Sequence, residues 1–274
     1  MSDNASSRKE HRRVDILGCP FDAITMAEVE QCIEDAIRRR EQLHITVGNV
    51  DMVMKARKDP RLARAFWESQ LTIVDGVPIT WAAAFLRRPV NGRVCGTDIV
   101  WRCAAISQKM NRGVALLGGG EGVAERAATN LRKAYPNSIL HVIPAPFPLR
   151  QEYTKRIIRI IRANDDRIVL VALGAPRQEC WLNEHLSATG ANVGIGIGAA
   201  FDIISGSKPQ APEWMRRNGL EWLHRMRLEP RRLSRRYLVE DMPFFGLLFK
   251  EWIKIALRRD MRNTDNRQFF NRIT

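Results

Sequence analysis

At 274 residues the chain can bury a substantial core, and its 45% hydrophobic and 27% charged residues exclude a chain that is mostly disordered. Lys and Arg outnumber Asp and Glu by 44 to 30, and the net charge of +14 predicts an anionic partner: nucleic acid, anionic lipid or a phosphorylated substrate. The five scattered cysteines lack zinc-ligand spacing and no run of about 18 apolar residues occurs, so neither a disulfide framework, a structural zinc nor a transmembrane span is expected.

Short strand-like segments alternate with helix-like segments along most of the chain. The strand-like segments are Val14–Gly18, His44–Gly48, Leu71–Asp75, Gly113–Gly118, Ile139–Ile143, Arg167–Gly174 and Asn192–Gly198. The helix-like segments are Met26–Arg39, Asn49–Arg57, Arg61–Glu68, Pro78–Leu86, Gly122–Tyr135, Gln151–Arg162 and Gln178–Ala188. Near-continuous Val, Ile and Leu runs separated by helices are typical of strands buried on both faces. We therefore predict an α/β fold whose mainly parallel sheet is flanked by helices.

Changes in composition divide the chain into three predicted regions. Residues 1–13 are polar and contain no apolar signal sequence, so we expect a disordered N-terminus. Residues 14–206 hold the alternating segments and are predicted to form the α/β domain. After Gly206 strand-like runs stop and Arg and Trp become frequent, so residues 207–274 are predicted to form a helical, basic appendage.

Polar residues and glycines follow five of the predicted strands. They are Asn49, Asp75, Gly118–Gly120, the pair Arg177 and Gln178, and Asp202. Ligands of open α/β sheets bind outside the carboxyl ends of the strands. The sequence therefore predicts one binding site at this edge of the sheet.

Asp75, followed by Gly76 at the end of a strand, is the strongest single candidate for catalysis. Partial burial in a cleft would raise its pKa and suit it to act as a general base. Asp-Gly is also common in turns, and Asp75 could instead cap the helix at Pro78–Leu86. Taken alone, the residue favours the structural alternative.

Arg93 and Asp98 follow Asp75 along the chain. The guanidinium of Arg93 offers a fork of donors for a diphosphate or a carboxylate, with an ordinary surface arginine as the alternative. Asp98 could equally cap a helix that starts at Ile99.

The segment Leu116–Ala127 places four glycines between a strand and a helix, which suits close approach of phosphate to a helix N-terminus. It matches the dinucleotide fingerprint only in part. A nicotinamide site also requires a carboxylate after the next strand. Here that strand, Ile139–Ile143, is followed by Pro-Ala-Pro-Phe-Pro, which contains no carboxylate. The pattern therefore favours phosphate binding over binding of NAD.

The segment Trp214–Tyr237 carries eight arginines against two glutamates, so it holds nearly half of the net charge of +14. Met242–Arg259 then combines apolar residues with Lys250, Lys254, Arg258 and Arg259, and is too short to span a bilayer. We expect it to lie in an anionic membrane surface, with Trp252 as an anchor. Two alternatives are nucleic-acid binding, for which no known motif is present, and packing on the core or on a second subunit.

Taken together, these segments resemble the bacterial glycosyltransferases of the WecG/TagA/CpsF family. The first motif is Asp75-Gly76 followed by Arg93-Val94-Cys95-Gly96-Thr97-Asp98, and the second is the long segment Gly194–Tyr237, which includes Ala211-Pro212-Glu213-Trp214 and Gly219-Leu220-Glu221-Trp222. A third, Gly174–Trp181, is similar to the family's G-x-P-x-Q-E-x-W. The resemblance covers Val14 to Tyr237.

The resemblance implies a Rossmann-like fold of the GT-E type and an inverting enzyme. Such an enzyme moves a hexose-type sugar from a UDP-sugar to an undecaprenyl-diphosphate-linked glycan, for a cell-surface or exported polysaccharide, at the cytoplasmic face of the inner membrane. Homo-oligomers are possible and no nucleic acid is expected. Because no DxD motif is present, no obligatory metal and no cofactor is predicted.

Roles are carried over by motif. Asp75 becomes the general base, and Asn49, Arg93, Gln178 and Asp202 become donor-site residues. The predicted donor and substrate set also includes Thr46, Asp98, Gly118, Gly119 and Arg177. In the appendage, Arg225, Arg232 and Arg235 are implied to neutralise a diphosphate.

Two positions depart from the family pattern. The family threonine would stand at Val47, whereas Thr46 is one residue earlier, and Pro144–Leu149 replaces a G-Y-F-like segment, which implies a changed sugar pocket. Two other classes stay open: a membrane- or nucleic-acid-binding module with a degenerate Rossmann core, and a nicotinamide-dependent oxidoreductase. Binding of UDP against NAD would separate them.

Overall fold

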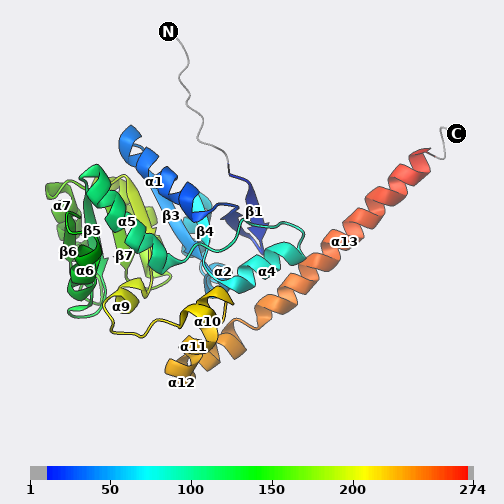
Figure 1. The fold of residues 1–274 in the computed structure, drawn as a ribbon. Helices are drawn as coiled ribbons and strands as arrows, with labels where there is room; N and C mark the ends of the chain where they lie inside the picture. Colours follow the sequence, from blue (N-terminus) through cyan, green and yellow to red (C-terminus); the bar gives the residue numbers. More distant parts are fainter. Residues whose placement is uncertain (1–10, 271–274) are drawn as a thin grey trace, which may run out of the picture.

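The computed structural model describes residues 11–270, without the side chains of Arg217, Arg232 and residues 258–270. A parallel sheet lies between layers of helices, and a long C-terminal helix projects from the body (Figure 1). The predicted α/β fold with a helical C-terminal segment is confirmed. Of the residues 1–13 that we expected to be disordered, residues 1–10 lie outside the described part of the chain, and Arg13 belongs to strand β1, Arg13–Ile16.

The main sheet has six parallel strands in the order β4-β3-β8-β7-β5-β6. Its strands, in chain order, are β3 Leu43–Gly48, β4 Leu71–Val74, β5 Gly113–Gly118, β6 Leu140–Ile143, β7 Asp166–Ala172 and β8 Val193–Gly196. Their side chains are almost all buried, because helices cover both faces. The Val, Ile and Leu runs of the sequence follow from this double burial.

The helices of the core are α1 Met26–Arg39, α2 Val50–Ala56, α3 Pro60–Glu68, α4 Val77–Phe85, α5 Gly96–Met110, α6 Val123–Ala134, α7 Gln151–Ala163, α8 Arg177–Thr189 and α9 Ala200–Ile204. One apolar cluster joins the sheet to α1, α5, α6 and α9, and another joins it to α7 and α8. The predicted helix positions are largely confirmed. One boundary was wrong: α5 begins at Gly96, so Asp98 lies in its first turn and does not cap it.

The strand expected at Val14–Gly18 is not part of the main sheet. It forms β1, Arg13–Ile16, which pairs antiparallel with β2, Cys19–Asp22, in a separate hairpin. The prediction that this segment opens the parallel series was wrong, because the chain reverses at once through Leu17 and Gly18, both with positive φ. The hairpin covers a third apolar cluster, formed with α2, α3 and α4.

The C-terminal segment consists of α10 Glu213–Arg217, α11 Glu221–Leu228, α12 Pro230–Arg235, the π-helical turn η1 Arg236–Glu240 and α13 Pro243–Phe270. Phe244 and Leu248 of α13 are buried in the cluster under the hairpin, which anchors this helix to the core. None of the described helices combines the length and the apolarity needed to cross a membrane.

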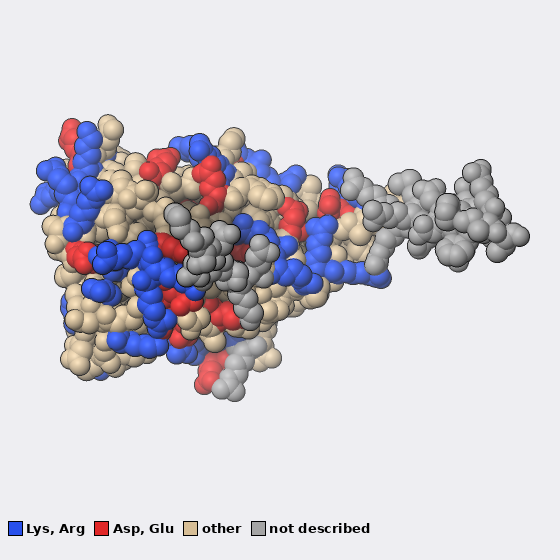
Figure 2. Space-filling model, turned by 90° about the horizontal axis from the view of Figure 1, so that it is seen from above, with Lys and Arg blue, Asp and Glu red and all other residues tan. Residues whose placement is uncertain are grey.

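Basic side chains are spread over the face of the molecule seen in Figure 2 and continue onto the base of the projecting helix. Acidic side chains lie among them. On this face the basic side chains are therefore not gathered in a single patch.

Candidate active site

Asp75 lies at the carboxyl end of β4, beside the end of β3. The parallel register pairs Gly48 with Val74, and the Asp75 backbone N–H donates to the Gly48 carbonyl over 2.9 Å. This pairing places Asn49 and Asp75 next to each other at the rim of the sheet. Gly76, not Asp75, is the N-cap of α4, so the helix-capping role does not explain the carboxylate.

The carboxylate faces a cavity of about 340 Å³ between the core and the appendage. From the core, its polar lining is Asn49, Asp51, Asp75 and Arg93. From the appendage, its polar and aromatic lining is Glu221, Trp222, Arg225, Arg236, Tyr237 and Asp241. The two parts approach closely here, because a Cβ at Gly219 would collide with the side chain of Val77.

Burial, the largest influence, raises the pKa of Asp75 above its usual range. The positive charges of Arg225 and then Arg93 oppose this rise in pKa, while the negative charges of Glu221 and Asp98 add to it. A carboxylate whose pKa is raised is a stronger proton acceptor than an ordinary aspartate, as a general base requires.

Arg93 pairs with an appendage carboxylate. Its guanidinium donates to both oxygens of Glu221, over 2.9 and 3.1 Å, and both side chains are largely buried. Sequence patterns assigned Arg93 to substrate but gave no sign of this partner. The bidentate pair fixes the arginine beside Asp75 and ties α11 to the core.

Two further arginines line the cavity. Arg236 lies 3.2 Å from Asp51 and 3.7 Å from Asp241, so carboxylates on both sides of the cavity hold it. Arg225 lies one helical turn after Glu221 and has no ion pair with any residue that the structure describes within 4.0 Å. Arg225 is therefore the cavity guanidinium that is free to receive an anionic ligand.

The three arginines predicted in the appendage occupy different places. Arg225 lines the cavity beside Asp75. Arg235 has a side chain that is 79% exposed, lies 3.7 Å from Glu240 and does not line the cavity; its neighbour Arg236 does. The side chain of Arg232 lies outside the described part of the chain.

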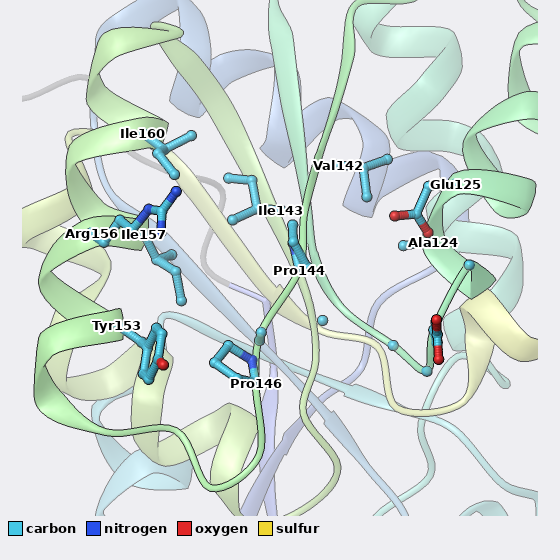
Figure 3. Close-up of a pocket in the computed structure, with 16 residues that line it drawn as sticks. Ala124, Glu125, Val142, Ile143, Pro144, Pro146, Tyr153, Arg156, Ile157 and Ile160 are labelled. Carbon is cyan, nitrogen blue, oxygen red and sulfur yellow. The ribbon is translucent and has the colours of Figure 1, made fainter.

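A second cavity, of about 560 Å³, lies at the carboxyl ends of β5 and β6. Gly118 and Gly119 form part of its wall, as the sequence led us to expect. Gly118 has a φ of +88°, and a Cβ there would lie 2.8 Å from the Ala172 carbonyl oxygen. Figure 3 shows Glu125 on one side of this cavity and Tyr153 and Arg156 of α7 on the other.

Gln178 is buried, and its amide joins two loops of the sheet edge. Its Oε1 accepts from the backbone N–H groups of Gly174 and Gly198, each over 3.2 Å. Its Nε2 donates to Glu179 over 2.7 Å. This geometry holds the loops after β7 and β8 in place and leaves the amide little capacity for a ligand.

The remaining predicted residues are dispersed around the rim. Asn49 lines the Asp75 cavity, and its Oδ1 accepts from the Met52 backbone N–H over 3.1 Å as the N-cap of α2. Thr46 is fully buried within β3, so its hydroxyl does not reach the cavity. Arg177 lies 4.6 Å from the ring centre of Phe147, and Asp202 is half-buried in α9.

Sequence analysis missed several residues of the Asp75 cavity. They are Asp51, Glu221, Trp222, Arg236, Tyr237 and Asp241. A signal existed for four of them, because Glu221 and Trp222 belong to the Gly-Leu-Glu-Trp segment of the resemblance, and Arg236 and Tyr237 end its long motif Gly194–Tyr237. Among the side chains that the structure describes, no group of three or more His, Cys, Asp or Glu is arranged to hold a metal, and metal-independent chemistry stays a prediction.

Similarity to known proteins identifies the family to which the chain belongs. The model of the Glycosyl transferase WecG/TagA/CpsF family matches residues 14–258, so the similarity continues past Tyr237, where the motifs of the sequence analysis end. Proteins of Staphylococcus aureus strains NCTC 8325 / PS 47 and MRSA252, each named N-acetylglucosaminyldiphosphoundecaprenol N-acetyl-beta-D-mannosaminyltransferase, are 26% identical over 240 residues. The alignment covers 87% of this chain and 92% of each relative. The chain belongs to the WecG/TagA/CpsF family of glycosyltransferases.

Proposed function

We propose that the protein transfers a hexose-type sugar from a UDP-sugar to an undecaprenyl-diphosphate-linked glycan, with inversion at the anomeric carbon. The observation that carries this proposal is the half-buried Asp75, whose carboxylate shares one cavity with Arg93 and Arg225. The names of the relatives support the acceptor class, since they state transfer to a diphosphoundecaprenol-linked sugar.

The chemistry is a direct displacement. A hydroxyl of the acceptor glycan attacks the anomeric carbon, the bond from that carbon to the diphosphate oxygen breaks, and UDP leaves with the bonding electrons. Asp75 takes the proton of the attacking hydroxyl, a contribution of about 10²- to 10⁴-fold in rate. Attack opposite the leaving group inverts an α-linked donor to a β-linked product, in agreement with the β-linkage in the relatives' names.

Arg225 and Arg93 stabilise charge on the diphosphates. Arg225 has no ion pair among the described residues and is the better candidate to move toward a phosphate. Arg93 is held by Glu221 and supplies a fixed positive charge beside the base. Cations placed in advance stabilise developing negative charge without reorganisation.

The donor nucleotide fits the second cavity. The backbone at Gly118–Gly120 lies before the N-terminus of α6, where phosphate groups bind well. β5 stands four places from β4, or roughly 19 Å at about 4.8 Å per strand. An elongated UDP-sugar lying across the strand ends would place its sugar near Asp75.

The C-terminal helix supports attachment to the cytoplasmic face of the membrane. Phe249, Trp252, Ile253 and Leu257 are exposed on α13, close in sequence to Lys250 and Lys254. Apolar and basic residues on one helix suit the interface of an anionic bilayer.

A screen of UDP-sugars with a GlcNAc-diphospho-polyprenol acceptor tests this function. We expect one UDP-sugar to be transferred, the linkage in the product to be inverted when examined by NMR, and UDP but not NAD to bind. Binding of NAD, or salt-sensitive binding of lipid or RNA with no affinity for UDP, would favour one of the two other classes instead.

A further inference from the structure

The cavity at Asp75 has two chemically different sides. Its charged lining includes Asp75 and Arg93, which are half-buried, and Arg225, which is exposed. Its outer side is apolar, with Trp81 from α4 and Leu238 and Phe245 from the appendage. A cavity with one charged and one apolar side matches a molecule that joins a charged head to a hydrocarbon chain.

The apolar side continues outward along α4 and α13, which lie side by side in Figure 1. The rings of Phe85 and Trp252 are 5.7 Å apart, so the two helices meet there. Phe249 stacks on Trp252 with 5.9 Å between ring centres. The cavity wall and these rings together form a surface that we name the α4–α13 groove: Trp81, Phe85, Leu238, Phe245, Phe249 and Trp252.

The residues of the groove are exposed although they are large and apolar. Trp81 is 61% exposed, Leu238 65%, Phe249 54% and Phe245 47%. Phe245, Phe249 and Trp252 are spaced four and three residues apart, and they therefore occupy one face of α13. A contiguous exposed apolar surface of this kind marks a site of interaction.

The groove is held in place relative to the base. Phe244 and Leu248 fix the first turns of α13 in the core cluster, so the neighbouring residues of the helix face outward at a defined position. On α4, Ile79, Ala82 and Ala83 are buried and leave Trp81 and Phe85 outside. The apolar path is therefore built onto the same rigid elements that position Asp75.

We propose that the α4–α13 groove binds the hydrocarbon chain of the lipid-linked acceptor, starting at the isoprene units next to its diphosphate. This inference rests on the proposed function and adds the path of the chain. The diphosphate lies at Arg225, and the chain leaves the cavity past Leu238 and Phe245 toward Phe249 and Trp252. Burying the first part of the chain here brings the acceptor sugar to Asp75 in one orientation.

A second apolar groove on the appendage is the competing path. It has a volume of about 770 Å³ and includes Trp214, Leu223 and Met226. None of its lining residues lines the Asp75 cavity, so a chain bound there would not be continuous with the charged side. The observations therefore favour the α4–α13 groove.

Two acceptors separate chain binding from catalysis in the full-length protein. Both carry the same sugar diphosphate, one on undecaprenol and the other on a short alkyl chain, and both are assayed in detergent micelles without a bilayer. We expect Phe249→Ser combined with Trp252→Ser, two groove residues outside the lining of the Asp75 cavity, to lower kcat/KM about tenfold or more for the long-chain acceptor. With the short-chain acceptor we expect a change within about twofold, because the charged side is intact.

Leu223→Ser, in the competing groove, is the matched control. Its kcat/KM should stay within about twofold of wild type with the long-chain and with the short-chain acceptor. An equal loss with both acceptors, no loss with either, or a larger long-chain loss in Leu223→Ser would overturn the inference.

Labelling gives a reading that does not depend on turnover. A polyprenyl diphosphate with a photoreactive group in its first isoprene units should label peptides that contain Trp81–Phe85 and Met242–Trp252. Labelling confined to α10–α12, or no labelling of α4 and α13, would contradict the groove. If wild-type protein is labelled on α4 and α13 but transfers sugar to neither acceptor, the proposed function fails while the chain-binding site stands.

Discussion

The α/β core and the C-terminal appendage keep their apolar side chains in opposite places. In the core, β5 and β7 are buried on both faces, and Val114 to Leu117 have no exposed surface. After Gly206, the buried large apolar side chains among the described residues are Leu233, Phe244 and Leu248. The core is stabilised by its own interior, whereas the appendage is held by a few anchors and by ion pairs.

This contrast indicates which parts of the candidate site come from the core and which come from the appendage. The core supplies Asp75, the proposed base, and the glycine-lined cavity. The appendage supplies Glu221, Arg225 and Arg236 to the same site and presents Phe249 and Trp252 outward. Apolar residues that the chain does not bury itself are available to cover a lipid.

The largest expected effect among the appendage variants is at Arg225. Arg225→Ala removes the cavity guanidinium that has no ion pair among the described residues, and we expect kcat to fall about 10²- to 10³-fold, because a positive charge at the diphosphate is lost. Binding of UDP to the core should change little. The control is Arg227→Ala, an arginine of the same helix outside the cavity; an equal loss there would show a general effect of charge.

Phe244 tests the anchor between the two regions. Phe244→Ala removes a fully buried ring, at a cost of about 3 to 5 kcal/mol, and should release α13 from the hairpin cluster. Hydrogen exchange should rise in α13 and η1 while β5 and β7 stay protected. Phe249→Ala, which removes an exposed ring, should leave the exchange of α13 unchanged; loss of protection throughout the sheet in Phe244→Ala would mean that the two regions unfold together.

Glu221 tests the pairing across the boundary. Glu221→Gln replaces a charged bidentate pair with a weaker neutral contact, and we expect kcat/KM to fall roughly tenfold. Because the charge of Glu221 raises the pKa of Asp75, its removal should also shift the acid limb of the pH profile to lower pH. Glu240→Gln, outside the cavity, should change neither kcat/KM nor the pH profile. If the acid limb of the pH profile stays in place in Glu221→Gln, the role of Glu221 is purely structural.

The smallest effect is expected at Asp241. Burial raises the pKa of Asp241 to about 6, with Arg236 opposing the rise, so the folded protein favours the protonated carboxyl more than the unfolded chain does. Its contribution to stability is therefore full below about pH 4 and is lost as pH rises through about 6. Asp241→Asn should raise the free energy of unfolding at pH 8 by on the order of 1 kcal/mol and change it little at pH 4. The opposite pH trend would contradict this assignment.

Much of the core could be predicted, because strands that are buried on both faces consist largely of Val, Ile and Leu. The structure adds the parallel register of β3 and β4, which places Asn49 beside Asp75. The hairpin could not be predicted in the same way. Val14–Gly18 resembles the other strands, and its antiparallel partner is only four residues long and contains Pro20.

Which polar residues line the site could not be predicted from the spacing of residues in the sequence, because it depends on the local backbone geometry and on contacts between distant segments. The π-helical turn at Arg236–Glu240 interrupts the regular helix, and Arg236 rather than Arg235 faces the cavity. Thr46 lies within β3 with its side chain fully buried. The partner of Arg93 is 128 positions away at Glu221, a distance over which no local pattern acts.

The most direct measurement is the turnover of Asp75→Asn, with the affinity for UDP determined on the same sample. Asparagine keeps the size of the side chain but cannot take the proton of the acceptor hydroxyl, so kcat should fall about 10²- to 10⁴-fold while UDP binds as in wild type. Turnover at the wild-type rate would contradict Asp75 as the base, and loss of UDP binding together with turnover would place the residue in the donor site instead.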